Sequence, residues 1–69
     1  MKVGSYIRHY LYKNRGERIY RYGIVIKIVY YSPSKFANVL WHVSPHYALH
    51  KSPYFETIKI NLLEVVSEP

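Results

Sequence analysis

The stretch that most constrains this chain runs from residue 19 to residue 31 and reads IYRYGIVIKIVYY. β-Branched and aromatic residues fill it, and these residue types favour an extended strand. Neither set of alternating positions is cleanly polar, so one straight strand would expose apolar side chains to water on either face. We therefore expect the strand to bend and to turn a different face to the core in each half, with Gly23 at the bend.

The rest of the chain also has strand character, and no amphipathic helical pattern or internal repeat interrupts it. Further strands are expected at residues 3–12, 36–43, 54–60 and 64–66. The connections are expected as a polar loop at 13–18, a turn at 32–35, a proline-containing loop at 44–53 and a single 3-10 turn at 61–63.

Sixty-nine residues allow one small domain. Five short strands are too few for an ordinary sandwich, and a strongly bent, partly open barrel is the compact arrangement that removes most free edges. The sequence thus predicts an all-β fold, a small five-stranded barrel of residues 1–66 with a frayed tail at 67–69.

Several classes of protein are excluded by what the sequence lacks. Without cysteine there is no disulfide, thiolate metal site or cysteine nucleophile. No apolar run reaches the roughly 18 residues of a membrane span, and no signal-peptide pattern opens the chain, so we expect a cytoplasmic protein. No phosphate-binding glycine loop, close carboxylate pair or nucleophile with a base is present, and we expect neither an enzyme nor a cofactor.

Short motifs mark the expected strands in order along the chain. They are Val3-Gly4 with Tyr6-Ile7-Arg8, Gly23-Ile24-Val25 with Ile28, Asn38-Val39-Leu40-Trp41, Ile58 and Ile60, and Leu62-Leu63-Glu64-Val65-Val66. This order resembles small SH3-like barrels of the KOW and Tudor type, although the loop at 44–53 is longer than in a KOW motif. The opening VGSYIRH is closer still to short, uncharacterised bacteriophage proteins. The resemblance implies an SH3-like barrel from a phage, in the host cytoplasm or the virion, but no particular function.

Positive charge is concentrated in the first half of the chain. Residues 1–35 hold eight Lys and Arg against Glu17 alone, whereas residues 36–69 hold two against three Glu. These cations alternate with tyrosines, and nucleic-acid surfaces combine cations for phosphates with flat rings for stacking. The residues expected to contact nucleic acid, whether DNA or RNA, are Arg8, Lys13, Arg15, Arg18, Arg21, Tyr10, Tyr12 and Tyr22.

On the expected hairpin, Arg8, Tyr10 and Tyr12 would share one face, and Arg21 and Lys27 the other. If three to five phosphates are neutralised, log K should fall against log salt with a slope of about −3 to −4.5 on duplex. The alternative is a solvated hairpin whose charges only keep the protein soluble.

The second hypothesis is a protein-interaction module, either a virion component or a phage factor that docks on a host machine, which could form a homo-oligomer. Tyr, Trp and Arg are enriched at such interfaces. The expected anchors are Trp41, His46, Tyr47, His50 and Tyr54. His42, His46 and His50 have helical spacing, but Pro45 interrupts it and no carboxylate or thiolate is nearby, so no metal site is expected.

Overall fold

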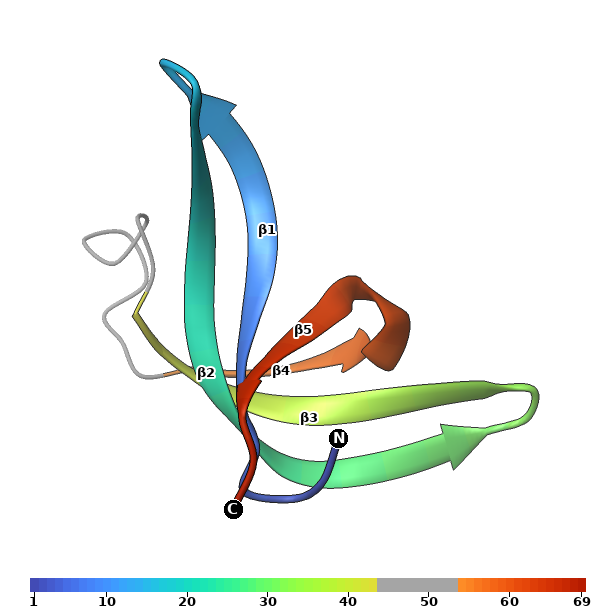
Figure 1. Ribbon diagram of the computed structural model, residues 1–69. Helices are drawn as coiled ribbons and strands as arrows, with labels where there is room; N and C mark the ends of the chain where they lie inside the picture. The colour runs from blue at the N-terminus through green and yellow to red at the C-terminus, as the bar shows by residue number, and fades with distance from the viewer. Residues whose placement is uncertain (44–53) are drawn as a thin grey trace.

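The computed structural model describes residues 1–43 and 54–69, and these form one antiparallel sheet of five strands (Figure 1). The elements are β1 (Tyr6–Asn14), β2 (Glu17–Tyr31), β3 (Ser34–Val43), β4 (Tyr54–Lys59), the 3-10 turn η1 (Ile60–Leu62) and β5 (Leu63–Ser67). The strand order is β4-β3-β2-β1-β5. The all-β prediction, the five strands and the 3-10 turn before the last strand are confirmed. The described part of the chain holds no helix that could span a membrane.

The long strand β2 belongs to both major hairpins. Its first half pairs with β1 and its second half with β3, so the two hairpins point in different directions, upward and to the right in Figure 1. β4 pairs with β3 and β5 pairs with β1, which makes β4 and β5 the two edges of the sheet. No ladder joins these edges among the described strands, and the connection between them is η1.

The β1–β2 connection is much tighter than the polar loop expected at residues 13–18. β1 continues to Asn14, which pairs with Glu17, so Arg15 and Gly16 alone make the turn. Both have positive φ, 50° and 84°, as a two-residue hairpin turn of the mirror-image type requires. The second hairpin is equally tight, because Tyr31 pairs with Ser34.

Strand β2 does turn different faces to the core in its two halves, and the switch is at Ile26. The register with β3 also shifts between Tyr22 and Gly23, but there the extra residue is His42 of β3, so the face of β2 does not change at Gly23. Val25 pairs with Val39, and Lys27 pairs with Asn38, which leaves Ile26 as the extra residue of a bulge. Lys27 and Arg21 therefore lie on different faces, contrary to the expectation that they share one.

Gly23 is needed for a different reason. A Cβ at this position would lie 2.7 Å from both the Leu40 carbonyl oxygen and Cγ1 of Val39, and 2.9 Å from Cε3 of Trp41. The backbones of β2 and β3 therefore approach closely only because residue 23 has no side chain.

The sheet curls around one small apolar core. Its buried members are Ile7, Val25, Ala37, Val39, Trp41 and Ile58. Met1, Ile28, Tyr54, Ile60 and Leu63 pack against this core from its margins. The core residues Ala37, Val39 and Trp41 alternate along β3, and Ile7 and Val25 face the same core from β1 and β2, so the opposite face of these strands points away from the core.

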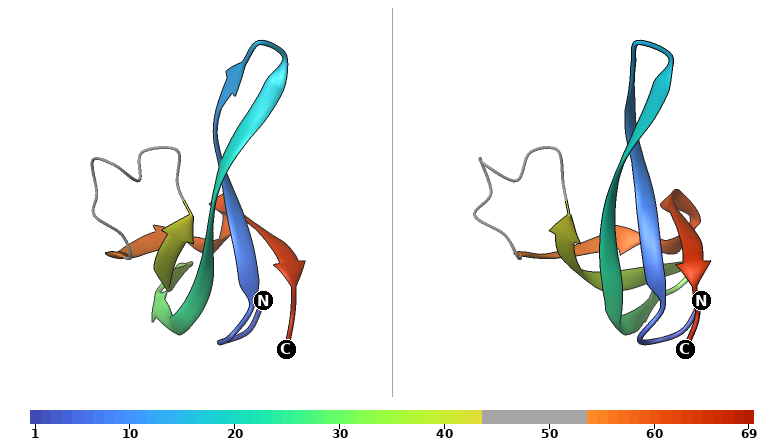
Figure 2. Two further views of the ribbon diagram at one scale, coloured as in Figure 1. Left: turned by 90° about the vertical axis from the view of Figure 1, so that its left-hand side faces the viewer. Right: turned by 60° about the vertical axis from the view of Figure 1, so that its left-hand side comes forward.

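The last residues of the chain lie against its start. Ser67 belongs to β5 and pairs with Tyr6. The Glu68 carboxylate lies 3.0 Å from the amino group of Met1, and this hydrogen bond lowers the pKa of Glu68. Both views in Figure 2 place the two ends side by side, at the end of the molecule opposite the β1–β2 turn.

Candidate nucleic-acid interface

The β1–β2 hairpin carries most of the basic and aromatic residues on the face that points away from the core. Directly paired residues of an antiparallel ladder share a face, and these pairs include Arg8 with Tyr22, Tyr10 with Tyr20, and Lys13 with Arg18. We call this surface the outer face and define it by Tyr6, Arg8, Tyr10, Lys13, Arg18, Tyr20 and Tyr22.

A bulge at Leu11 decides which residues of β1 reach the outer face. Tyr10 pairs with Tyr20, but Tyr12 pairs with Ile19, so the register shifts by one residue between them. Tyr12 therefore lies on the opposite face from Arg8 and Tyr10, contrary to the expectation that all three share one. Lys13 takes the place in the outer face that simple alternation assigned to Tyr12.

Five aromatic rings follow one another along the outer face. We call them the aromatic row, and in order they are His42, Tyr6, Tyr22, Tyr20 and Tyr10. Successive ring centroids are 5.3, 5.9, 6.4 and 5.9 Å apart. The Tyr6 and Tyr22 rings are stacked within 15° of parallel, whereas Tyr10 meets Tyr20 edge to face.

Three members of this row, Tyr6, Tyr20 and His42, were not among the expected contact residues. The even parity of Tyr6 and Tyr20 with Tyr10 and Tyr22 could have indicated the two tyrosines. His42 comes from β3, and only the β2–β3 register brings it beside Tyr6.

Two arginines lie over rings of the aromatic row. The guanidinium carbon of Arg8 is 4.1 Å from the Tyr20 centroid, and that of Arg18 is 5.7 Å from the Tyr10 centroid. Both distances lie in the range of attractive cation–π contacts. The Arg8 guanidinium also donates to Glu64 of β5, and this hydrogen bond raises the pKa of Arg8. The charge of Arg8 is thus balanced inside the molecule.

Three exposed cations without a carboxylate partner lie close together at the tip of the hairpin. Lys13, Arg15 and Arg18 are all exposed. Among residues 1–43 and 54–69, the only Lys or Arg side chains in ion pairs with carboxylates are Arg8 and Arg21. Glu17 is the single carboxylate of this turn region, so the tip keeps a net positive charge.

Arg21 lies on the face of the sheet that points toward the core, and its role is structural. It is 9% exposed, and its guanidinium carbon is 4.0 Å from the centroid of a Trp41 ring. Its Nε donates to Nδ1 of His9 over 3.1 Å, Nη1 donates to the Tyr54 hydroxyl over 3.0 Å, and Nη2 donates to the Glu56 carboxylate. With these donors engaged inside the protein, Arg21 leaves the set of candidate phosphate contacts.

His9, which accepts a hydrogen bond from Arg21, is itself partly buried. Burial lowers the pKa of His9, and the neighbouring positive charge of Arg21 lowers this pKa further, while the negative charge of Glu56 acts in the opposite direction. Neutral His9 can accept the hydrogen bond from Arg21, whereas a protonated imidazole has no acceptor nitrogen to offer.

Of the residues expected to anchor a protein partner, the structure describes only Trp41 and Tyr54, and neither is exposed. Trp41 is fully buried beneath Arg21, and Tyr54 is half-buried with its hydroxyl bound to Arg21. His46, Tyr47 and His50 lie outside the described residues. No group of three potential metal ligands occurs within the described ranges, where His42 stacks on Tyr6.

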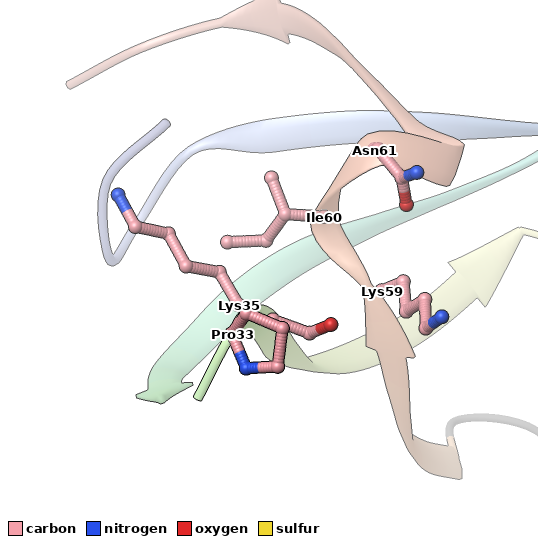
Figure 3. A pocket seen from close by; sticks show the side chains of 6 residues that line it. Pro33, Lys35, Lys59, Ile60 and Asn61 are labelled. Atoms are coloured by element: carbon pink, nitrogen blue, oxygen red, sulfur yellow. The ribbon is translucent and has the colours of Figure 1, made fainter. Parts of the chain in front are cut away.

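A hollow of about 340 Å³ lies between the β2–β3 turn and η1, away from the outer face. Its lining residues are Pro33, Ser34, Lys35, Lys59, Ile60 and Asn61. Figure 3 shows Ile60 pointing into the hollow, while the Lys35 and Lys59 side chains leave it on opposite sides. The two ammonium groups therefore do not converge on one ligand.

No family model matches this chain, and neither the curated proteins nor the solved structures include one with significant similarity to it.

Proposed function

We propose that this protein is a non-enzymatic, nucleic-acid-binding protein that uses the outer face of its β1–β2 hairpin. The observation that carries the proposal is the meeting, on one face of a projecting hairpin, of an aromatic row and exposed cations without carboxylate partners. The proposed phosphate contacts are Lys13 and Arg18 on the outer face and Arg15 in the adjoining turn, with Arg8, Tyr10 and Tyr22 alongside on the outer face.

We also propose that the sheet is an SH3-like barrel and that the protein is phage-encoded. The barrel is supported by the curled sheet, by the position of η1 between the last two strands, and by edges that this turn connects. A phage origin rests on the opening VGSYIRH alone.

Electrostatics predicts how such binding should respond to salt. Each neutralised phosphate releases counterions, which gives a slope of log K against log salt of about −0.9 per contact on duplex and about −0.7 on a single strand. With three cations at the tip, we expect a slope of about −2.7 on duplex and about −2.1 on a single strand. These slopes are shallower than the sequence alone predicted, because Arg21 and Arg8 are paired inside the fold.

The test is a fluorescence anisotropy titration of labelled oligonucleotides between about 50 and 200 mM salt. The variant K13Q/R15Q/R18Q removes the tip charges, and K27Q/K35Q/K59Q removes the same charge from elsewhere. We expect at least tenfold weaker binding for the tip variant and at most about threefold for the control. Equal losses in both variants, or binding that salt does not weaken, would contradict the proposal.

The protein-interaction alternative keeps one specific observation in its favour. Tyr30 and Tyr31 at the β2–β3 turn are 66% and 62% exposed, and Tyr31 meets Phe36 edge to face at 5.6 Å. Exposed tyrosines of this kind are frequent interface anchors. A partner bound there should remain bound in high salt and should be lost in the Y30S/Y31S variant.

A further inference from the structure

The aromatic row indicates whether the bound nucleic acid is single-stranded or double-stranded. We infer that the outer face binds a single strand, DNA or RNA, with bases stacked on the rings of the row; this inference rests on the proposed function. The surface has two components, rings along its length and cations toward its tip, and only a single strand can use both.

Each residue of the aromatic row is at least partly exposed. Tyr10 is 45% exposed, and Tyr6, Tyr20, Tyr22 and His42 are each partly exposed. The row spans three neighbouring strands, because His42 lies on β3, Tyr20 and Tyr22 on β2, and Tyr6 and Tyr10 on β1. A broad sheet face with rings on it is a suitable platform for splayed bases.

A duplex cannot use these rings without being opened. Its bases are stacked on one another inside the helix, so a ring reaches a base face only if a base step is unstacked. A single strand already offers its bases, and stacking on aromatic side chains then contributes to affinity at each base. The aromatic row should therefore strengthen binding to a single strand and leave duplex binding to the cations alone.

The cations are placed to follow the backbone of such a strand. Arg18 lies over Tyr10, so an exposed positive charge accompanies the end of the row nearest the tip. Lys13, which pairs with Arg18, extends the same face. Because every base has a π-face, binding through these groups should tolerate different sequences.

The experiment compares three ligands of one mixed sequence at the same salt concentration: single-stranded DNA, single-stranded RNA and the DNA duplex. The wild-type protein is measured beside Y10L and Y22L, which remove rings, and Y10F, which keeps one. Y31L is the matched control, because Tyr31 is an exposed tyrosine on the other hairpin. Circular dichroism confirms that each variant is folded.

We expect at least one of the single strands to bind about tenfold more tightly than the duplex. Y10L and Y22L should each weaken single-strand binding by about fivefold or more and change duplex binding by less than about twofold. Y10F and Y31L should match the wild type within about twofold. Quenching of tyrosine fluorescence by the single strand, reduced in Y10L, would report the stacking directly.

The two proposals fail in different ways. If the duplex binds as tightly as both single strands, or if Y10L and Y22L bind like Y31L, the single-strand inference is overturned while the proposed function stands. If no ligand binds even at low salt, the proposed function itself is overturned.

Discussion

Arg21 links three strands through one guanidinium group. Its partners His9, Tyr54 and Glu56 come from β1 and β4, and its flat face lies on Trp41 of β3. Glu56 is 35 residues away in sequence, so no local pattern around Arg21 could reveal that it is buried and paired. Arg15, Arg18 and Arg21 are three residues apart in sequence, and only the tertiary structure shows that Arg21 is buried while the other two are exposed.

The first residue-scale prediction concerns pH. Because the pKa of His9 is lowered in the folded state, the unfolded chain binds more protons below about pH 6.5, its ordinary value. The contribution of neutral His9 to stability is therefore fully present above about pH 6.5 and is lost as the pH falls toward the folded-state pKa. Urea unfolding at pH 7.5 and at pH 5 measures the change.

The matched variant for this prediction is H9Q, whose carbonyl can still accept a hydrogen bond from Arg21 but cannot titrate. Its unfolding free energy should decline less than that of the wild type as the pH is lowered. Identical pH dependence in the two proteins would show that His9 does not contribute.

The second residue-scale prediction concerns Gly23. In G23A the new methyl group would meet the Leu40 carbonyl and the Val39 side chain at 2.7 Å, so β2 and β3 must separate. We expect a loss of about 1–3 kcal/mol in unfolding free energy, as for other overpacked sites. T57A, an exposed position on β4, is the control and should change stability by less than about 0.5 kcal/mol. An unchanged denaturation midpoint in G23A would contradict the packing argument.

At the scale of the elements, the sequence predicts where the strands lie, but it predicts only in part which side chains lie on which face of the sheet. Alternating and β-branched residues locate the five strands within a few residues, because those patterns are local. The bulges at Leu11 and Ile26 are set by how neighbouring strands pair, and each one changes which side chains lie outward. This is why Tyr12 and Lys27 were assigned to the wrong faces while Arg8 and Tyr10 were assigned correctly.

The β1–β2 turn gives an element-scale prediction in which stability and binding change in opposite directions. Arg15 has a φ of 50°, a conformation that asparagine adopts more easily, and Asn-Gly is the preferred pair for this turn. R15N should therefore raise the unfolding free energy by up to about 1 kcal/mol while weakening nucleic-acid binding through the lost charge. R15K is the control and should leave both quantities nearly unchanged. Lower stability in R15N would contradict the turn assignment.

For the whole molecule, charge is divided between a basic hairpin and a carboxyl-terminal segment that partly neutralises it. Glu64 binds Arg8 across 56 residues of sequence, and Glu68 binds the amino group of Met1. The first half of the chain could be identified as basic from the sequence. The number of cations without a carboxylate partner could not be predicted from the sequence, because it depends on which carboxylates the fold places beside them.

Glu64 accordingly offers a test at this scale. E64Q removes the negative charge beside Arg8, so single-strand affinity should rise about threefold or more and the salt slope should steepen by about 0.7. E68Q makes the same change of net charge beside Met1, away from the outer face, and should have a smaller effect. Equal gains in both variants would indicate that only the total charge matters.

The contact between Met1 and Glu68 places both chain ends together, at the end of the molecule opposite the β1–β2 turn (Figure 2). A tag or surface tether attached to either end would therefore present the hairpin tip to solution unobstructed. Immobilising the protein by its N-terminus or by its C-terminus should then give equivalent capture of an oligonucleotide.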